Sequence, residues 1–195
     1  MGSEMCIRDR YYTNSFEYFQ GLLIIKNPEN IFMDPSRMSS RSIAFKKSCW
    51  RKVGGYPDLS SGEDTFFNLK LMKKNCKFVF ARDAIVYWRM RKNWREFIKQ
   101  FYKYGVGDRK SGNIWKMKKN LMFVFGFWAY AISLIFFVFI SFRLLIALLA
   151  PLFLYFLVCG IRLAIKSKRL NGIFYGFLLT LIKRIAYVIG VSFGK

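Results

Sequence analysis

The feature that most constrains the fold of this chain is a run of 22 uncharged residues at positions 121–142, LMFVFGFWAYAISLIFFVFISF. An α-helix rises about 1.5 Å per residue, so this run reaches roughly 33 Å and can cross a bilayer core of about 30 Å. A second apolar run follows Arg143 and covers residues 144–161. It supplies about 27 Å of helix, and its Pro151 is compatible with a kinked membrane helix. We therefore predict two transmembrane helices that form a tight hairpin.

The rest of the apolar half leaves more than one interpretation open. Two buried core helices are the alternative to the hairpin, but the remaining residues, about 100 of them, offer too little surface to cover so many apolar side chains. Residues 170–182 form a third apolar segment, which Lys183 and Arg184 interrupt before it resumes to about residue 193. Thirteen apolar residues are too few to span a bilayer unless the two cations lie at an interface or face a partner. An interfacial or re-entrant helix and a third crossing both remain possible here.

Positive charge is concentrated beside these segments. The chain has 33 Lys and Arg against 11 Asp and Glu, a net charge of +22. Eleven of the cations lie between residues 89 and 119 and four between residues 162 and 169, whereas Arg143 alone lies between the two spans. By the positive-inside rule, both ends of the hairpin are cytoplasmic. Because no early apolar stretch resembles a signal peptide, we expect a multi-pass protein of the cell inner (cytoplasmic) membrane whose soluble part faces the cytoplasm.

Two residue types restrict the chemistry. The chain has no histidine, so a general base that belongs to this chain must be a carboxylate or a rarer group. The four cysteines show no C-x-x-C pair and are scattered through unrelated segments. Their spacing therefore suggests neither a zinc site nor a disulfide framework, and it fits a reducing compartment.

Turn residues and apolar spacing outline the soluble part. SIAF at residues 42–45 is a strand candidate, and VGGYPD at residues 53–58 is a turn built on two glycines and a proline. Ser61 and Asp64 approximate a capping box, so we expect a helix to follow Gly62 and to end at the basic sequence KKN.

Two further strand candidates lie downstream. KFVF at residues 77–80 and AIVYW at residues 84–88 flank Arg82 and Asp83, which we expect to form a turn. Helices that alternate with short strands predict an α/β fold for this half of the chain.

An amphipathic helix is predicted just before the first membrane span, at residues 94–104. Its aromatic and aliphatic side chains recur at helical spacing, and Arg95, Lys99 and Lys103 take the other side; the apolar set is Trp94, Phe97, Ile98, Phe101 and Tyr102. The helix either lies along the cytoplasmic leaflet or packs on the soluble core. Periodicity does not identify what the apolar face contacts.

Adjacent carboxylates at Glu63 and Asp64 open the helix that follows the Gly-Gly-Tyr-Pro turn. Acids in the first turn of a helix stabilise it by about 0.3–1 kcal/mol each, so helix capping alone would account for them. Their surroundings point further, because residues 37–108, with GGYPDLSSGED at their centre, resemble the second half of the catalytic domain of family 2 glycosyltransferases. The resemblance implies a partial GT-A (nucleotide-diphospho-sugar transferase) domain at residues 11–115, followed by a membrane domain at residues 116–195.

The resemblance also implies roles for individual residues. Asp64 matches the general base that deprotonates the acceptor hydroxyl in inverting transfer, with Glu63 as an orienting or acceptor-binding neighbour. A carboxylate suits this role because an Asp with a pKa near ~3.9 is ionised at pH 7. Arg89, Arg91 and Lys92 would meet the leaving diphosphate, for which guanidinium groups are well shaped. The alternative for these three cations is a basic patch that faces the membrane.

The part of the family pattern that binds the donor is not found in the sequence. Family members hold a divalent metal ion, Mg²⁺ or Mn²⁺, through an Asp-x-Asp that precedes the matched region, and no Asp-x-Asp occurs in this chain. We therefore expect an amino-terminally truncated, inactive fragment in which this chain ligates no metal. Residues 1–10, MGSEMCIRDR, look like translated adapter sequence and are predicted to be a non-native leader.

Together these features predict a membrane-anchored, hexosyltransferase-like inverting glycosyltransferase. It would transfer a sugar from a nucleotide-sugar to a lipid-linked or cell-envelope acceptor, with membrane lipids as partners. The alternative is a non-catalytic basic membrane protein that binds anionic lipid or a protein partner. Nucleic acid is not expected as a partner, because the cations cluster beside the membrane spans and no nucleic-acid-binding module is recognised.

Overall fold

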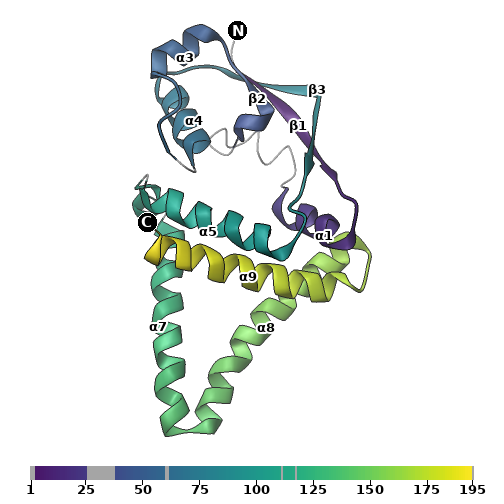
Figure 1. Ribbon diagram of the computed structural model, residues 1–195, viewed down its shortest axis with the longest axis vertical. Helices are drawn as coiled ribbons and strands as arrows, with labels where there is room; N and C mark the ends of the chain where they lie inside the picture. Colours follow the sequence, from purple (N-terminus) through teal and green to yellow (C-terminus); the bar gives the residue numbers. More distant parts are fainter. Residues whose placement is uncertain (1–2, 26–37, 60–61, 111, 117, 195) are drawn as a thin grey trace. The chain divides into compact units, whose positions relative to one another are not determined.

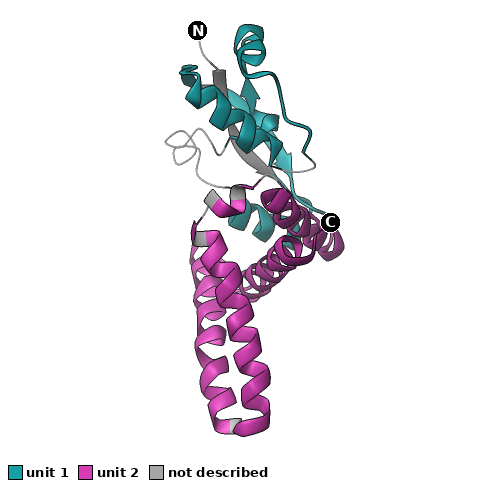
Figure 2. Ribbon diagram, turned by 90° about the vertical axis from the view of Figure 1, so that its left-hand side faces the viewer, with its two compact units in different colours: residues 1–92 teal, residues 93–195 magenta. Residues whose placement is uncertain are grey.

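The computed structural model describes residues 3–25, 38–59, 62–110, 112–116 and 118–194. Its contacts divide the chain into two compact units, residues 1–92 and residues 93–195 (Figure 2). The sequence-based boundary near residue 115 assigns the amphipathic helix to the soluble domain, whereas the contacts group that helix with the apolar helices. The extent of the catalytic domain itself stays a prediction.

A three-stranded mixed sheet lies in the first unit. Strands β1 (Ser3–Tyr11), β2 (Ile43–Ala44) and β3 (Phe78–Arg89) follow the order β2-β1-β3 (Figure 1). β1 runs antiparallel to β2 and parallel to β3. β2 confirms, in shorter form, the strand predicted at residues 42–45. The segment predicted to be a non-native leader thus supplies most of the central strand, and its origin stays a prediction.

The predicted pair of strands around a turn at Arg82 and Asp83 is wrong, because β3 continues through these residues. The register against β1 moves from Cys6 opposite Ala81 to Ile7 opposite Ile85. Consecutive residues of β1 therefore pair with residues of β3 that are four apart. The extra residues are accommodated in an irregularity of the bulge type, and the pairing with β1 is parallel on both sides of it.

The described residues of the first unit also form the helical segments α1 (Ser15–Ile24), the 3₁₀ turn η2 (Ser40–Ser42), α3 (Lys47–Val53) and α4 (Glu63–Lys73). α4 confirms the helix predicted after Gly62. The predicted cap residue Ser61 lies outside the described residues, and the structure has Gly62 at the N-cap. Described strands are few and helices predominate, so the α/β GT-A arrangement is not confirmed by this fold and stays a prediction.

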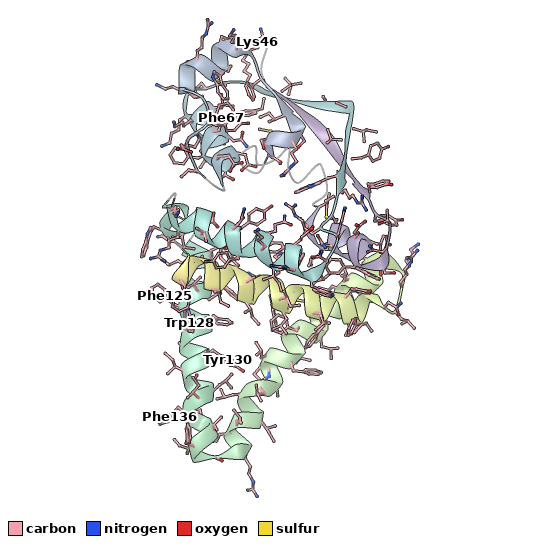
Figure 3. All side chains as sticks on the ribbon, viewed as in Figure 1. Lys46, Phe67, Phe125, Trp128, Tyr130 and Phe136 are labelled. Carbon is pink, nitrogen blue, oxygen red and sulfur yellow. The ribbon has the colours of Figure 1, made fainter. Side chains whose placement is uncertain are left out.

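The core between α3 and α4 is aliphatic and aromatic. Val53, Phe67 and Leu71 are buried, and Figure 3 places Phe67 among the side chains of these two helices. Trp50 and Tyr56 pack against the same cluster. Burial of one such phenylalanine contributes about 1.5–3 kcal/mol, so this cluster fixes α4 relative to the turn that precedes it.

The second unit contains α5 (Trp94–Lys110), the short α6 (Asn113–Lys116), α7 (Lys118–Ile140), α8 (Phe142–Ser167) and α9 (Gly172–Phe193). Three of these described helices, α7, α8 and α9, are long and apolar enough to cross a membrane. α7 and α8 meet at Ser141 and form the predicted hairpin (Figure 1), in which the Tyr130 hydroxyl donates to the Leu148 carbonyl. Phe125 and Phe136 project outward from α7 (Figure 3), as membrane-facing side chains do.

α9 lies beside α5 over much of its length and crosses the start of α7 (Figure 1). The two helices run parallel, because the Lys183 ammonium lies over the Phe101 ring and the Arg109 guanidinium donates to the Ser192 carbonyl. Two glycines, Gly105 and Gly190, let the backbones approach closely. The apolar face of α5 therefore packs on α9, and the sequence had left open what this face contacts.

Candidate active site

The acidic pair lies at the first turn of α4, as the sequence predicts. Glu63 and Asp64 are half-buried, and Asp64 Oδ1 accepts a hydrogen bond of 2.8 Å from the Thr65 N–H. Gly62 precedes them with a φ of 80°, a left-handed conformation that glycine adopts without strain. The carboxylates thus lie at the positive end of the helix dipole and remain partly open to solvent.

The Gly-Gly-Tyr-Pro turn brings a phenol to the same place. Gly54 and Gly55 have φ values of 73° and 72°, and a side chain on Gly55 would collide with the Trp50 ring. Tyr56 then packs its ring 4.3 Å from that of Phe67. Its pKa is raised, chiefly by burial and also by the negative charges of Asp64 and Glu63.

Tyr56 is therefore a member of the site that sequence reasoning missed as a functional residue. The signal was present, because the tyrosine belongs to the Gly-Gly-Tyr-Pro turn that leads to the acidic pair. What the sequence did not show was that the turn folds back onto α4. A phenol that keeps its proton can donate a hydrogen bond to a nearby carboxylate or to a bound hydroxyl group.

The predicted basic residues lie at the other end of β3, against α1. Arg89 Nη2 is 3.4 Å from Glu17 Oε1, in a pair whose arginine is 45% exposed and whose glutamate is 1% exposed. Gln20 binds the backbone of Arg91 at both polar atoms: its Oε1 accepts from the Arg91 N–H at 2.9 Å, and its Nε2 donates to the Arg91 carbonyl at 3.2 Å. α1 thus anchors the Arg-Met-Arg-Lys sequence, whose Arg91 and Lys92 side chains are exposed.

Glu17 is a second residue that the sequence analysis missed. Burial pushes its pKa upward, but hydrogen bonds from the Thr13 N–H and hydroxyl, together with the charge of Arg89, outweigh burial and leave the pKa lowered. Asn14 caps α1 by accepting from the Glu17 N–H at 2.9 Å. The pattern Asn14-x-x-Glu17 is a capping signature and could have located the start of this helix.

The structure does not bring the two predicted sets together. Figure 1 shows α4, with Glu63 and Asp64, on the opposite side of the first unit from the carboxyl end of β3, with Arg89. Among the residues that the structure describes, no three Asp, Glu, Cys or His side chains gather as metal ligands. The two carboxylates of α4 therefore do not form a complete ligand set for Mg²⁺ or Mn²⁺ by themselves, since such ions take about six oxygen ligands.

One comparison with known families decides what kind of protein this is. The family model described as glycosyl transferase family group 2 matches residues 8–186, which is most of the chain. The chain belongs to this family of glycosyltransferases. A search of curated proteins finds no match to it.

The match confirms the resemblance to family 2 glycosyltransferases and extends it on both sides of residues 37–108. It includes α1, the whole of α7 and α8, and most of α9. The apolar helices of this glycosyltransferase thus belong to the family pattern, as does the α1 segment that anchors Arg89 and Arg91. Family membership implies, in general terms, a nucleotide-sugar donor and an acceptor.

Proposed function

We propose that this chain carries the acceptor-binding part of the active site of an inverting glycosyltransferase, with Asp64 as the general base. The observation that supports the proposal most directly is the position of Asp64: a half-buried carboxylate in the first turn of α4, beside the Gly-Gly-Tyr-Pro turn. The left-handed glycines and the Phe67 packing hold this turn in place, so the base would be pre-positioned before the acceptor arrives.

In the proposed reaction the acceptor hydroxyl oxygen attacks the anomeric carbon of the nucleotide-sugar. The bond from that carbon to the diphosphate breaks, and the nucleoside diphosphate leaves with the electron pair. Asp64 takes the hydroxyl proton as the new bond forms, so its basicity is needed in the transition state. Glu63 orients the acceptor, and the protonated Tyr56 phenol is available as a hydrogen-bond donor beside both carboxylates.

We assign Arg89, Arg91 and Lys92 to the leaving diphosphate. Arg91 and Lys92 are exposed, and the Gln20 contacts hold the Arg91 backbone in one conformation. One edge of the Arg89 guanidinium group faces Glu17, but the side chain is 45% exposed. A guanidinium group has several N–H donors, so some of them remain for a phosphate oxygen. A Mg²⁺ or Mn²⁺ ion bound by an Asp-x-Asp outside this sequence would neutralise diphosphate charge, and the described residues supply no ligand set for it.

The acceptor is proposed to be lipid-linked or part of a cell-envelope polysaccharide, and the enzyme to lie in the cytoplasmic membrane with its catalytic part facing the cytoplasm. Three apolar helices and the basic, exposed side of α5 support this location. An acceptor held in the bilayer would reach a soluble domain that is anchored beside it.

Asp64→Asn tests the base directly, in an enzyme that also carries the donor-binding segment. The change keeps the size of the side chain and much of its capping ability, so stability should change by no more than about 1 kcal/mol. We expect kcat to fall at least about 10²-fold while donor affinity stays nearly unchanged, because general-base catalysis contributes about 10²–10⁴-fold. Glu63→Gln serves as the matched control and should be milder.

The readouts are kcat, donor affinity and melting temperature for both variants. Lower stability with normal turnover in the folded fraction would mean that the acidic pair only caps α4, as expected for a non-catalytic membrane protein. Equal losses of kcat in both variants would remove the assignment of the base to Asp64 alone.

A further inference from the structure

The fold brings together two cysteines that the sequence shows as unrelated. Cys49 lies on α3 and Cys76 follows the end of α4, and both pack against the buried cluster of Val53, Phe67 and Leu71. Both also line a single pocket. Spacing along the chain did not indicate that these two cysteines lie near each other, and both are free thiols in this structure.

Backbone motifs fix both positions. α4 ends with Asn75 in a left-handed conformation at a φ of 53°, and the Cys76 N–H donates to the Leu71 carbonyl at 3.0 Å. α3 ends in the same way at Gly54, and the Gly55 N–H donates to the Trp50 carbonyl at 3.1 Å. These are Schellman-type helix ends, which hold the residues around them in defined positions.

Two hydrogen bonds also join α3 to α4 and to the residues that follow it. The Lys52 ammonium, on α3, donates to the Lys74 carbonyl at 3.0 Å, just before Cys76. The Lys70 ammonium, on α4, donates to the Val53 carbonyl at 3.5 Å. The two segments that carry the cysteines are therefore held together by contacts that do not depend on the thiols, as a disulfide requires of its supports.

A solvent-accessible pocket of about 330 Å³ reaches both cysteines. Its other lining residues are Ser48, Lys52, Asn75 and Lys77, so two ammonium groups flank the thiols. This charge favours entry of an anionic reagent. Oxidised glutathione is such a reagent, because it carries carboxylates and a disulfide.

We propose that Cys49 and Cys76 form a dithiol site that closes reversibly into a disulfide by exchange with an anionic low-molecular-weight disulfide. The thiolate of one cysteine attacks a sulfur of the reagent, forms a mixed disulfide and releases one thiol. The thiolate of the second cysteine attacks the protein sulfur of that mixed disulfide and releases the other thiol. The pair loses two hydrogens and two electrons, and the reagent is reduced to two thiols.

Burial is the main cause that raises the pKa of the Cys76 thiol, contact with Cys49 raises it further, and the Lys52 charge opposes both. In the proposed exchange either cysteine makes the first attack, and the other then resolves the mixed disulfide. The bond closes a ring that contains the Gly-Gly-Tyr-Pro turn and the acidic pair.

The test treats the purified 195-residue chain, in detergent, with oxidised glutathione, then blocks remaining thiols and digests with trypsin. Residues 48–51 and 75–77 should be recovered as one linked peptide, lighter by two hydrogens than the sum of its parts and separated by reduction. Cys76→Ser should instead retain glutathione on Cys49, and Cys49→Ser should retain it on Cys76, because neither variant has a second thiol to resolve the mixed disulfide.

Two controls distinguish oxidation that depends on the folded structure from non-specific oxidation of any cysteine. Cys159→Ser should leave the linked peptide unchanged, and unfolding in urea before oxidation should abolish the preference for the link between Cys49 and Cys76. Stable glutathione adducts on both cysteines of the folded wild-type chain would overturn the proposal. So would links from Cys49 to Cys159 that form as fast as links to Cys76.

Discussion

At the scale of single residues, Glu17 shows how a buried charge can be stabilised by local contacts. The carboxylate accepts from the Thr13 N–H at 2.8 Å and from the Thr13 hydroxyl at 3.0 Å, and it faces Arg89. A carboxylate with several hydrogen bonds to its charged form has a lowered pKa even when it is buried. Glu17 therefore links the start of α1 to the end of β3 through its negative charge.

Glu17→Gln should destabilise the first unit by about 1–3 kcal/mol at pH 7, because the neutral amide weakens these bonds and leaves Arg89 unpaired. The effect should depend on pH. A folded-state pKa below the unfolded value gives a stabilisation that is present above the unfolded pKa, near 4.5, and is lost as the pH falls through the folded pKa. The melting temperatures of wild type and variant should therefore converge below about pH 4.5.

The measurement is thermal unfolding between pH 7 and pH 3.5, followed by loss of sheet signal. Asp58→Asn is the matched control, because Asp58 is an exposed acid of the same unit. A difference between wild type and Glu17→Gln that stays constant down to the lowest pH would contradict the role given to the charge.

Individual residues were predicted where a local rule applied. Glu63 and Asp64 do lie in the first turn of α4, because capping and dipole preferences act within one helical turn. Tyr56 beside the acidic pair, Glu17 beside Arg89 and the two cysteines in one pocket were not predicted. Each depends on which segments the fold brings together, and spacing along the chain carries no such information.

At the scale of elements, glycines allow α5 to pack closely on α9. Its buried side contains Phe97, Phe101 and Val106, and a Cβ atom on Gly105 would lie 2.7 Å from the Val191 nitrogen of α9. Backbone atoms have little room to move aside, so close helix contact requires glycine there. Periodicity predicted an apolar face on α5, but it did not predict that the face is complementary to α9.

Gly190→Ala should separate α5 from α9, because the added Cβ would collide with the Tyr102 backbone. We expect a destabilisation of about 1–3 kcal/mol and faster proteolysis within α5. Gly126→Ala is the control on α7, where nothing lies within 4 Å of the added Cβ. It should be neutral or stabilise by up to about 1 kcal/mol, from helix propensity. Equal effects of the two substitutions would show that close packing at Gly190 does not matter.

At the scale of the whole molecule, length and hydropathy predicted the apolar helices well. The expected spans at residues 121–142 and 144–161 correspond to α7 and α8, and the third segment to α9. These properties depend on local composition and act over one helix length. The soluble part was predicted less well, because α1 and α3 were not anticipated and β3 was divided in two.

Membrane topology provides a prediction at this scale. α9 lies beside the basic α5 and crosses α7, so we expect α7 and α8 to span the bilayer and α9 to lie at the cytoplasmic surface (Figure 1). In a background without native cysteines, Arg143→Cys should react with an impermeant reagent from outside. Lys168→Cys and a cysteine added after Lys195 should both react only from inside. Opposite sides for the last two positions would mean that α9 crosses the membrane, and an inside location for position 143 would reverse the hairpin.

The pairing of α5 with α9 also sets an order of events during synthesis. Gly172, the first residue of α9, follows Lys110, the last of α5, by 62 residues, and the α7 and α8 hairpin lies between them. At about 5–20 residues per second, the ribosome needs roughly 3–12 s to add that stretch. Throughout this interval the apolar face of α5 has no α9 to pack against. We expect the membrane surface to shelter α5 first, and α9 to take its place once the chain is released.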